Sequence, residues 1–332
     1  MPATNDTSDY QIHPGCAPLS SYAGAVTERL MLLDTASLYF RAFFGVPDKV
    51  KAPDGSSVNA TRGLLDIIAK LVTLYQPSQI IACWDDDWRP QWRVDLIPSY
   101  KAHRVVEEIT ASPDVEEVPD ALQQQIPLIR AALGVLGIPI IGVAEHEADD
   151  VIGTLATHAA LPVDIVTGDR DLFQLVDDSR DVRVIYTARG MSNLEIITDE
   201  TVVAKYGVLP SQYADFATMR GDASDGLPGV KGIGEKTAAT LLRAHGDLAG
   251  IRAAAAEGLL SATAATRFSE ASDYLDVAPT VVEVATDLDI AAPGTALGDL
   301  TTADRDAAEA LAEQWNLGTS MSRALTALAS ED

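Results

Sequence analysis

The sequence predicts an α/β fold with a mostly parallel sheet that is flanked by helices. Short, continuous apolar runs alternate with amphipathic helical patterns over the first two-thirds of the chain, which is typical of buried parallel strands. Acidic residues follow several of these runs directly. From about residue 199 the pattern changes to short helices that glycine and proline separate. The chain has 332 residues, of which 47% are apolar, so it can bury a sizeable core in one large or two modest domains.

The elements are predicted in order from their local patterns. Residues 1–28 are rich in small and polar side chains, show no period and are expected to form a flexible extension; we hypothesise a native start near Val26 or Met31. Strands are predicted at residues 30–33, 80–84, 138–143, 163–167 and 182–186. Helices are predicted at residues 60–75 and 120–136, from near Glu147, and in the Ala-rich stretch 249–274.

The composition restricts both the location and the mode of binding. No apolar run is long enough to cross a bilayer, and the first thirty residues lack a signal pattern, so we expect a cytoplasmic protein. Cys16 and Cys83 lie far apart, which suits a reducing compartment. The net charge of −25, from 24 basic and 49 acidic residues, argues against nucleic-acid binding by global attraction.

Acids follow four of the predicted strands at the point where each strand ends. They are Asp34, Asp85, Asp86, Asp87, Glu147, Asp149, Asp150, Asp169 and Asp171. In an open parallel sheet, ligand sites form beyond the carboxyl ends of the strands, so these acids are predicted to share one edge. A single Asp after a strand is commonly a helix cap or turn former, but four strands that all carry acids favour a site.

A carboxylate cluster of this kind predicts a metal site. Like charges repel unless a cation lies among them, and carboxylate-only ligation favours Mg²⁺ or Mn²⁺. Histidine and cysteine are too few and too scattered for zinc. Two ions about 4 Å apart can activate water and stabilise the leaving oxygen in a phosphoryl displacement. A P-loop motif is absent from the sequence, so P-loop nucleotide hydrolysis is not supported.

The segment from Gly221 to Ala238 predicts a contact with a nucleic-acid backbone. Asp222 and Asp225 lie three residues apart, which predicts that they share one side of a helix. A glycine-rich loop then leads into a helix at Glu235, where backbone N–H groups can approach a phosphate. The expected contacts are Gly229, Lys231, Gly232, Gly234, Lys236 and Thr237. The alternative is an ordinary connection between two helices.

A second basic segment alternates cations with aromatic residues. It contains Trp88, Arg89, Trp92, Arg93, Tyr100, Lys101, His103 and Arg104. Such a pattern can hold and stack a single strand, although a solvated surface segment is the alternative. Residues 105–129 lack Lys and Arg and are expected to be mobile.

Together these motifs resemble the bacterial 5′-nuclease (flap endonuclease) family, the 5′→3′ exonuclease domain of DNA polymerase I and its stand-alone relatives. The resemblance covers roughly residues 29–290. It is carried by LMLLDTASLYFRAF at 30–43, YKAHR at 100–104, EADD at 147–150, GDRD at 168–171 and GDASDGLPGVKGIGEKTA at 221–238.

The resemblance implies a domain organisation and an activity. It implies a PIN-like catalytic core at 29–205 with a helical arch at about 88–125, a helix-two-turns-helix DNA-binding region at 206–290, and a C-terminal segment at 291–332 that packs on the core. The implied enzyme is a monomeric 5′→3′ exonuclease and flap endonuclease that uses two-metal catalysis in DNA replication and repair. Its implied substrates are DNA with 5′ flaps, nicks or 5′ ends, and RNA–DNA junctions, so that it also removes RNA primers.

The resemblance also implies roles for individual residues. The metal ligands, or their water-mediated supports, are Asp34, Asp85, Glu147, Asp149, Asp150, Asp169, Asp171, Asp222 and Asp225. The basic catalytic positions are Lys101, at the scissile phosphate, with Arg104, Arg93 and Arg41; Tyr100 joins the DNA contacts. Carbonyls of the glycine hairpin are expected to hold K⁺.

The chain departs from the family pattern at two places. Alignment with the family pattern from the second strand selects Asp85 as a ligand, whereas alignment from Arg93 selects Asp86. We favour Asp85 because the register of a strand is harder to shift than the length of a loop. Gly226 stands where the family often has Asn. Two alternatives are a non-catalytic DNA-structure-binding homologue, which would need lost ligands, and an RNA-directed PIN-type ribonuclease, which usually lacks the hairpin.

Overall fold

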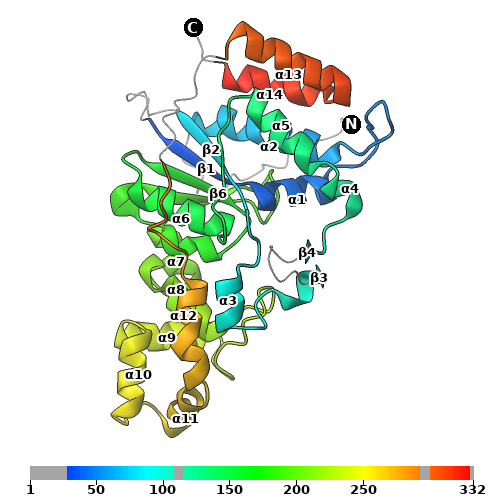
Figure 1. Ribbon diagram of the computed structural model, residues 1–332. Helices are drawn as coiled ribbons and strands as arrows, with labels where there is room; N and C mark the ends of the chain where they lie inside the picture. Colours follow the sequence, from blue (N-terminus) through cyan, green and yellow to red (C-terminus); the bar gives the residue numbers. More distant parts are fainter. Residues whose placement is uncertain (1–27, 108–114, 292–299, 330–332) are drawn as a thin grey trace, which may run out of the picture.

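A mostly parallel six-stranded sheet forms the centre of the computed structural model, which describes residues 28–107, 115–291 and 300–329 (Figure 1). The strand order is β5-β2-β1-β6-β7-β8, and only β7 and β8 pair antiparallel. The strands are β1 (Leu30–Asp34), β2 (Gln79–Cys83), β5 (Ile140–Ile141), β6 (Val163–Thr167), β7 (Val182–Tyr186) and β8 (Glu195–Ile197). The predicted sheet is confirmed, although β5 is shorter than predicted and β8 was not predicted. The extension at 1–27 and Cys16 lie outside the described residues.

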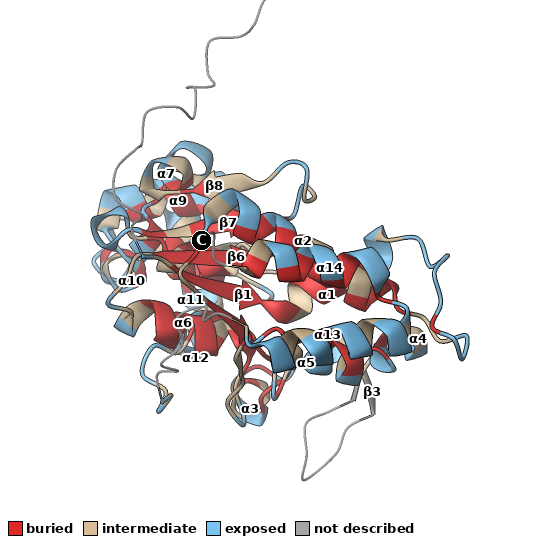
Figure 2. Cartoon of the chain, turned by 90° about the horizontal axis from the view of Figure 1, so that it is seen from above, coloured by how far each residue is buried: buried red, intermediate tan, exposed pale blue. Residues whose placement is uncertain are grey.

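The sheet is buried on both faces because helices cover each side (Figure 2). Leu30 and Leu32 of β1 belong to one hydrophobic cluster and Met31 and Leu33 to the other, as the alternation along a strand requires. The second cluster is covered by α1 (Thr35–Gly45), α2 (Asn59–Tyr75), α5 (Ile126–Val135), α13 (Thr302–Trp315) and α14 (Gly318–Leu328). The first is covered by α6 (Ala148–His158), the 3₁₀ turn η2 (Asp171–Leu175) and α7 (Asp199–Tyr206), while the 3₁₀ turn η3 (Asp178–Arg180) lies beside β7. No helix among the described residues is long and apolar enough to span a membrane.

A group of helices extends from one end of the sheet, at the bottom of Figure 1. It contains η4 (Pro210–Gln212), α8 (Tyr213–Arg220), α9 (Glu235–His245), α10 (Leu248–Ala256), α11 (Ala262–Glu270) and α12 (Ser272–Val282). The helix predicted from Glu235 is confirmed. The prediction that Asp222 and Asp225 share a helical side is wrong, because α8 ends at Arg220 and both acids lie in the following turn.

The segment expected to form a helical arch has little helix in its described part. It contains α3 (Gln91–Leu96), the 3₁₀ turn η1 (Ala102–Arg104), the antiparallel strands β3 (Val105–Glu107) and β4 (Val115–Glu116), and α4 (Asp120–Gln123). Pro90 precedes α3 and the β-branched Val105 begins β3, which favours a short helix followed by extended chain. Residues 108–114 lie outside the described ranges.

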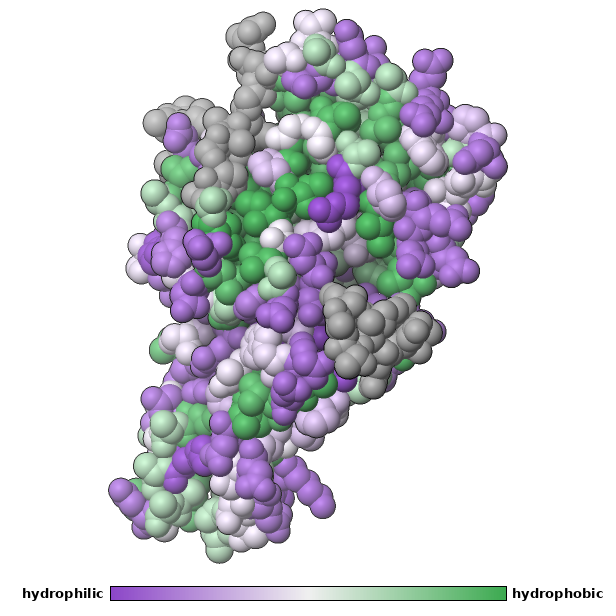
Figure 3. Space-filling model, in the orientation of Figure 1, coloured by the Kyte–Doolittle hydropathy of each residue, from purple (hydrophilic) through white to green (hydrophobic). Residues whose placement is uncertain are grey.

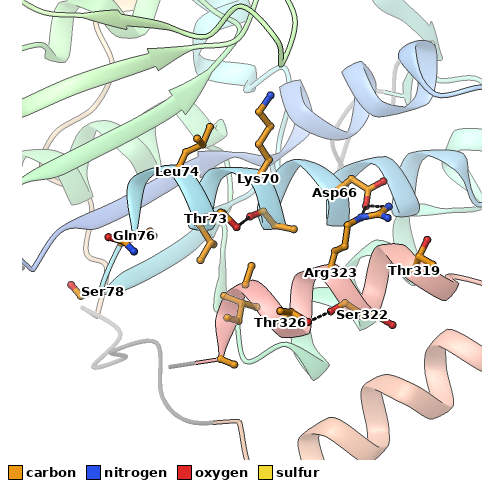
Figure 4. A pocket seen from close by; sticks show the side chains of 16 residues that line it. Asp66, Lys70, Thr73, Leu74, Gln76, Ser78, Thr319, Ser322, Arg323 and Thr326 are labelled. Carbon is orange, nitrogen blue, oxygen red and sulfur yellow. Dashed lines mark hydrogen bonds and ion pairs between the residues drawn. The ribbon is translucent and has the colours of Figure 1, made fainter. Parts of the chain in front are cut away.

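A groove of about 1220 Å³ lies between α2 and α14 (Figure 4). Its lining includes Asp66 and Arg323, which form an ion pair across it at 2.6 Å, and contains none of the predicted site residues. On the face shown in Figure 3, the broadest hydrophobic area lies over the upper part of the molecule, and hydrophilic residues are frequent around the middle. The chemistry therefore has to be sought at the carboxyl edge of the sheet, away from this groove.

Candidate metal and nucleic-acid site

The acids predicted at strand ends do lie at the carboxyl edge of the sheet, and local hydrogen bonds orient them. Asp34 ends β1 and caps α1 by accepting from Ser37 N at 3.2 Å, while Thr167 Oγ1 donates to its other oxygen at 2.6 Å. Asp85, just after β2, accepts from Ala148 N at 2.8 Å in the first turn of α6. Capping and clustering therefore coexist, because the same carboxylates satisfy helix ends and meet at one edge.

We call Asp34, Asp85, Asp149 and Asp169 the inner acids. Burial and the neighbouring carboxylates raise the pKa of Asp34 to about 7, against the hydrogen bond from Thr167. Burial, with a contribution from Glu147, raises the pKa of Asp85 to about 6. Burial together with Asp34 and Asp169 raises the pKa of Asp149 well above its usual range. These side chains are close enough to repel one another. Carboxylates that share one bound cation repel one another in the same way when the cation is missing.

We call Asp171, Asp222 and Asp225 the outer acids. Burial and the charges of Asp169 and Asp225 raise the pKa of Asp171 well above its usual range. Asp171 Oδ1 is buried without a hydrogen-bond partner in the described part of the chain. A cavity of about 20 Å³ is lined by Asp149, Asp171 and Asp225, among others, and this volume suits one water or a single ion.

The inner and outer acids fit hard divalent cations. Their donors are carboxylate oxygens, burial has removed water from several of them, and one buried oxygen lacks a partner. Within the described ranges, however, no group of three or more acidic, imidazole or thiol side chains is arranged closely enough to hold a metal ion. The arrangement therefore resembles a set of ligands that an ion must draw together, with mutual repulsion as the force that favours its binding.

Two of the predicted ligands have other partners. Asp150 is fully buried and accepts two hydrogen bonds from Arg93, at 2.7 and 2.8 Å, and one from Ala285 N at 2.9 Å. Glu147 accepts from Tyr100 Oη at 2.7 Å and is paired with Lys101. The lone pairs of Asp150 are thus occupied, and its carboxylate faces α3.

The basic segment is also placed differently from its prediction. Tyr100 is 4% exposed and its hydroxyl is bonded to Glu147, so it does not lie on the surface, and its predicted contact with DNA stays a prediction. Arg93 is 3% exposed and lies between Asp150 and Glu147 instead of facing a substrate. Lys101 is buried against Glu147, and Arg104 Nη2 lies 3.1 Å from Asp225 Oδ1. The cations expected to meet a phosphate are therefore paired with the acids.

The surroundings of Asp86, Asp85 and Arg41 bear on two further predicted positions. Asp86 is exposed and lies against Gly142, whereas Asp85 faces Asp34 and Glu147, which favours Asp85 as the member of the cluster. Arg41 lies on α1 beside Gly168, and its Nε is buried without a hydrogen-bond partner among the described residues.

The glycine hairpin between α8 and α9 is available to a ligand. Its predicted contact residues that are exposed are Lys231, Gly232, Gly234, Lys236 and Thr237. Gly229 and Gly232 have φ of 65° and 77°, the left-handed backbone that glycine adopts readily. Arg267 Nη1 donates to Gly232 O at 3.0 Å, so one carbonyl of the hairpin already has a partner.

Two residues at the site were not predicted. Thr167, the last residue of β6, donates to Asp34, and its Oγ1 also accepts from Asp169 N at 2.9 Å. Arg220, the last residue of α8, pairs with Asp222 at 3.2 Å. The sequence offers a signal for each, because Thr167 ends a strand directly before Gly168-Asp169 and Arg220 directly precedes Gly221-Asp222.

Gly226 explains how the outer acids meet the segment that carries Lys101. Its φ is 70°, and a Cβ atom there would lie 1.9 Å from Ser99 O. Lys101 N donates to Asp225 O at 3.0 Å and Ser99 Oγ to Gly226 O at 2.7 Å. A side chain at position 226 would push these two segments apart.

We therefore expect Gly226→Ala to destabilise the fold by about 1–3 kcal/mol and to lower cleavage, because the clash adds to the strain of a positive φ. Urea unfolding and cleavage rates measure the two effects. Gly258→Ala is the matched control, since φ there is 73° and nothing lies within 4 Å of the added carbon. Equal losses in both variants would show that backbone strain alone is responsible.

Comparisons with known proteins agree on one family. Residues 29–207 match the 5′-3′ exonuclease N-terminal resolvase-like domain, and residues 208–307 match the 5′-3′ exonuclease C-terminal SAM fold. A 5′-3′ exonuclease of Streptomyces coelicolor is 60% identical over 302 residues, covering 90% of this chain and 99% of that protein. A 5′-3′ exonuclease of Mycobacterium tuberculosis is 48% identical over 315 residues, covering 90% and 97%. The solved structure of a T5 5′-exonuclease with bound divalent metal ions (zinc) is similar in fold, with a TM-score of 0.59 at 19% identity, covering 91% of this chain and 100% of that one.

Proposed function

Because the chain belongs to the 5′-3′ exonuclease family, we propose that it hydrolyses DNA phosphodiesters at 5′ flaps, nicks and 5′ ends as a metal-dependent nuclease. The observation that carries the proposal is the set of inner and outer acids at the carboxyl edge of the sheet, with a basic segment and a glycine hairpin beside it. The expected products have a 5′-phosphate and a 3′-hydroxyl. RNA–DNA junctions, and hence RNA primers, belong to the proposed substrates.

The inner and outer acids would hold two or more Mg²⁺ or Mn²⁺ ions. When bound, these ions would supply an activated water and charge neutralisation at the scissile phosphate. Thr167 keeps Asp34 oriented, and Ala148 N does the same for Asp85. We assign Asp150 and Arg93 a positioning role. The two guanidinium nitrogens of Arg93 donate to both carboxylate oxygens of Asp150, so that this carboxylate is not a metal ligand. Glu147, paired with Lys101, belongs to the support of the site.

Lys101 and Arg104 are the residues proposed to stabilise negative charge on the phosphate. Both are paired with acids, namely Glu147 and Asp225. Ion binding by the acids would weaken these pairs and free the two cations for the substrate. Arg41, beside Gly168 on α1, is a further cation at the same edge with an unsatisfied donor.

DNA binding is proposed to rest on local contacts, because the net charge of −25 opposes global attraction. The exposed backbone N–H groups and lysines of the glycine hairpin suit a phosphate backbone. A K⁺ ion at the hairpin carbonyls would have to share them with Arg267. We assign catalysis to residues 29–205, duplex binding to 206–290 and support of the core to 291–332, within a monomer.

A cleavage assay on a 5′-labelled flap tests the proposal. We expect cutting with Mg²⁺ or Mn²⁺ and none with EDTA, and the size of the released product separates flap cutting from stepwise trimming. A non-catalytic DNA-structure-binding protein would instead bind the flap without cutting it under either condition. An RNA-directed enzyme would cut a single-stranded RNA and leave the DNA flap intact.

The stability of the metal-free protein is expected to fall as the pH rises from about 4 to about 7. In the folded protein the pKa of Asp34 is raised to about 7 and that of Asp85 to about 6, from the ordinary Asp value of 3.8. Protonation of these two carboxyls therefore stabilises the fold fully below the pKa of the unfolded chain, and this stabilisation is lost as the pH rises through the pKa values of the folded protein. Added Mg²⁺ should therefore raise the melting temperature more at the higher pH, because its ligands must be deprotonated. Melting curves with EDTA and with Mg²⁺ measure this, and an equal Mg²⁺ effect at both pH values would contradict it. In Asp34→Asn the pH dependence should be smaller.

A further inference from the structure

The two groups of acids differ in the cations around them. In the described part of the chain, Lys and Arg form no ion pair with Asp34, Asp149 or Asp169. The outer acids, by contrast, have guanidinium groups beside them. Arg220 Nη2 lies 3.2 Å from Asp222 Oδ2 and 3.9 Å from Asp171 Oδ1, and Arg104 Nη2 lies 3.1 Å from Asp225 Oδ1. Paired guanidinium groups are thus present at the outer acids, whereas Asp34, Asp149 and Asp169 have no ion-pair partner among the described residues.

Arg220 is held in this position from several sides. Its side chain is 9% exposed, its Nε donates to Gly221 O at 3.0 Å, and its guanidinium lies over the Phe216 ring at 5.6 Å from the centroid. Arg104 is 35% exposed by comparison, so its pair is more readily solvated. Arg220 is therefore the more firmly fixed cation beside the outer acids.

The pairing at Arg220 is incomplete. Its Nη1 and Asp171 Oδ1 are both buried, and both lack a hydrogen-bond partner among the described residues. Leaving a buried donor and acceptor unsatisfied is costly, so a purely structural ion pair should not retain them. An unsatisfied donor and acceptor are expected, by contrast, where Arg220 and Asp171 change hydrogen-bond partners when a ligand binds.

We propose that Arg220 is a positioning residue that neutralises the outer acids before any ion arrives, so that a divalent ion binds the inner acids first and the outer acids more weakly. A guanidinium and a divalent ion compete for the same carboxylate oxygens, and the ion must displace or repel Arg220 to bind there. Asp34, Asp149 and Asp169 have no guanidinium paired with them among the described residues, so an ion that binds there meets no such competition. This inference rests on the proposed function, because it requires the acids to bind metal.

Calorimetric titration of the metal-stripped full chain with Mn²⁺ alone tests the proposal. The wild type should show one tight and one weaker binding event. Arg220→Met should tighten the weaker event by about 10-fold or more and leave the tight event unchanged. Arg220→Lys, which keeps the charge, should stay near the wild type. Arg243→Met removes a positive charge from α9, away from the acids, and should change neither event.

The outcomes separate this inference from the proposed function. An unchanged weaker event in Arg220→Met would overturn the role of Arg220 while leaving a metal-dependent nuclease intact. Absence of any Mn²⁺ binding by the wild type would overturn both. If Arg220→Met loses its fold, Arg220→Gln keeps a donor to Asp222 without the charge and must show the same tightening. A merely structural role would lower the melting temperature of either variant without strengthening Mn²⁺ binding.

Discussion

Asp149→Asn is expected to lower DNA cleavage by about 10³-fold and, at the same time, to stabilise the metal-free protein. Asp149 lies in the first turn of α6, where burial and the carboxylates of Asp34 and Asp169 raise its pKa well above the usual range. The amide has nearly the same shape but no charge, so it removes repulsion from the metal-free cluster. It also removes an anionic ligand, so metal binding and cleavage should fail.

Opposite signs of the two effects distinguish a catalytic acid from a structural one. Single-turnover cleavage rates and melting curves in EDTA measure them, and binding of a flap substrate should survive because the hairpin is unchanged. Asp164→Asn is the matched control, since Asp164 is fully buried in β6 but bonded to Arg29 and Arg183, both at 2.8 Å. We expect that control to lose stability and keep its cleavage rate per folded molecule. Asp149→Asn protein that cuts at the wild-type rate would remove Asp149 from the site.

Local patterns predicted the sheet well wherever burial alone defines the strand. β6 and β7 have the predicted bounds because each is a short run of mostly β-branched and apolar residues, interrupted only by Asp164 or Arg183, between turn residues. β5 is shorter than its apolar run because Pro139 has no N–H to donate, although its carbonyl accepts from Ala82 N. The helix predicted at 120–136 is divided at Gln124–Gln125, since Pro127 has no N–H to donate to the carbonyl of Gln123 one turn earlier and lies in the first turn of α5, where a proline is tolerated.

The position of the acids was predictable, but the identity of their partners was not. Strand ends bring Asp34, Asp85 and Asp169 to one edge because parallel strands end together. Whether a Lys or Arg side chain of the segment after β2 faces solvent or an acid depends on how this segment packs on α6 and α12. Local sequence patterns do not predict such long-range contacts. Alternating cations and aromatics therefore indicated a nucleic-acid surface at Tyr100, whereas packing buries it against Glu147.

Arg93→Met is expected to destabilise the protein by about 3–5 kcal/mol, the largest stability loss among the changes considered. Arg93 donates to both oxygens of Asp150, lies 3.2 Å from Glu147 Oε1 and donates from Nε to Val281 O at 3.1 Å. It thereby ties α3 to α6 and α12. Methionine fills much of the volume but leaves a fully buried carboxylate without its counter-ion, and the energy of that uncompensated charge should dominate.

A double-mutant cycle checks this explanation against lost packing. Adding Asp150→Asn removes the stranded charge, so the double variant should unfold at a higher urea concentration than Arg93→Met alone. Arg323→Met supplies the surface comparison, because its pair with Asp66 is 54% and 41% exposed and should contribute only about 0–1 kcal/mol. If the double variant were no more stable than Arg93→Met, shape and not charge would account for the loss. Arg93 also anchors the segment that carries Lys101. If the double variant recovers stability but not cleavage, this anchor also positions the basic residues for the substrate.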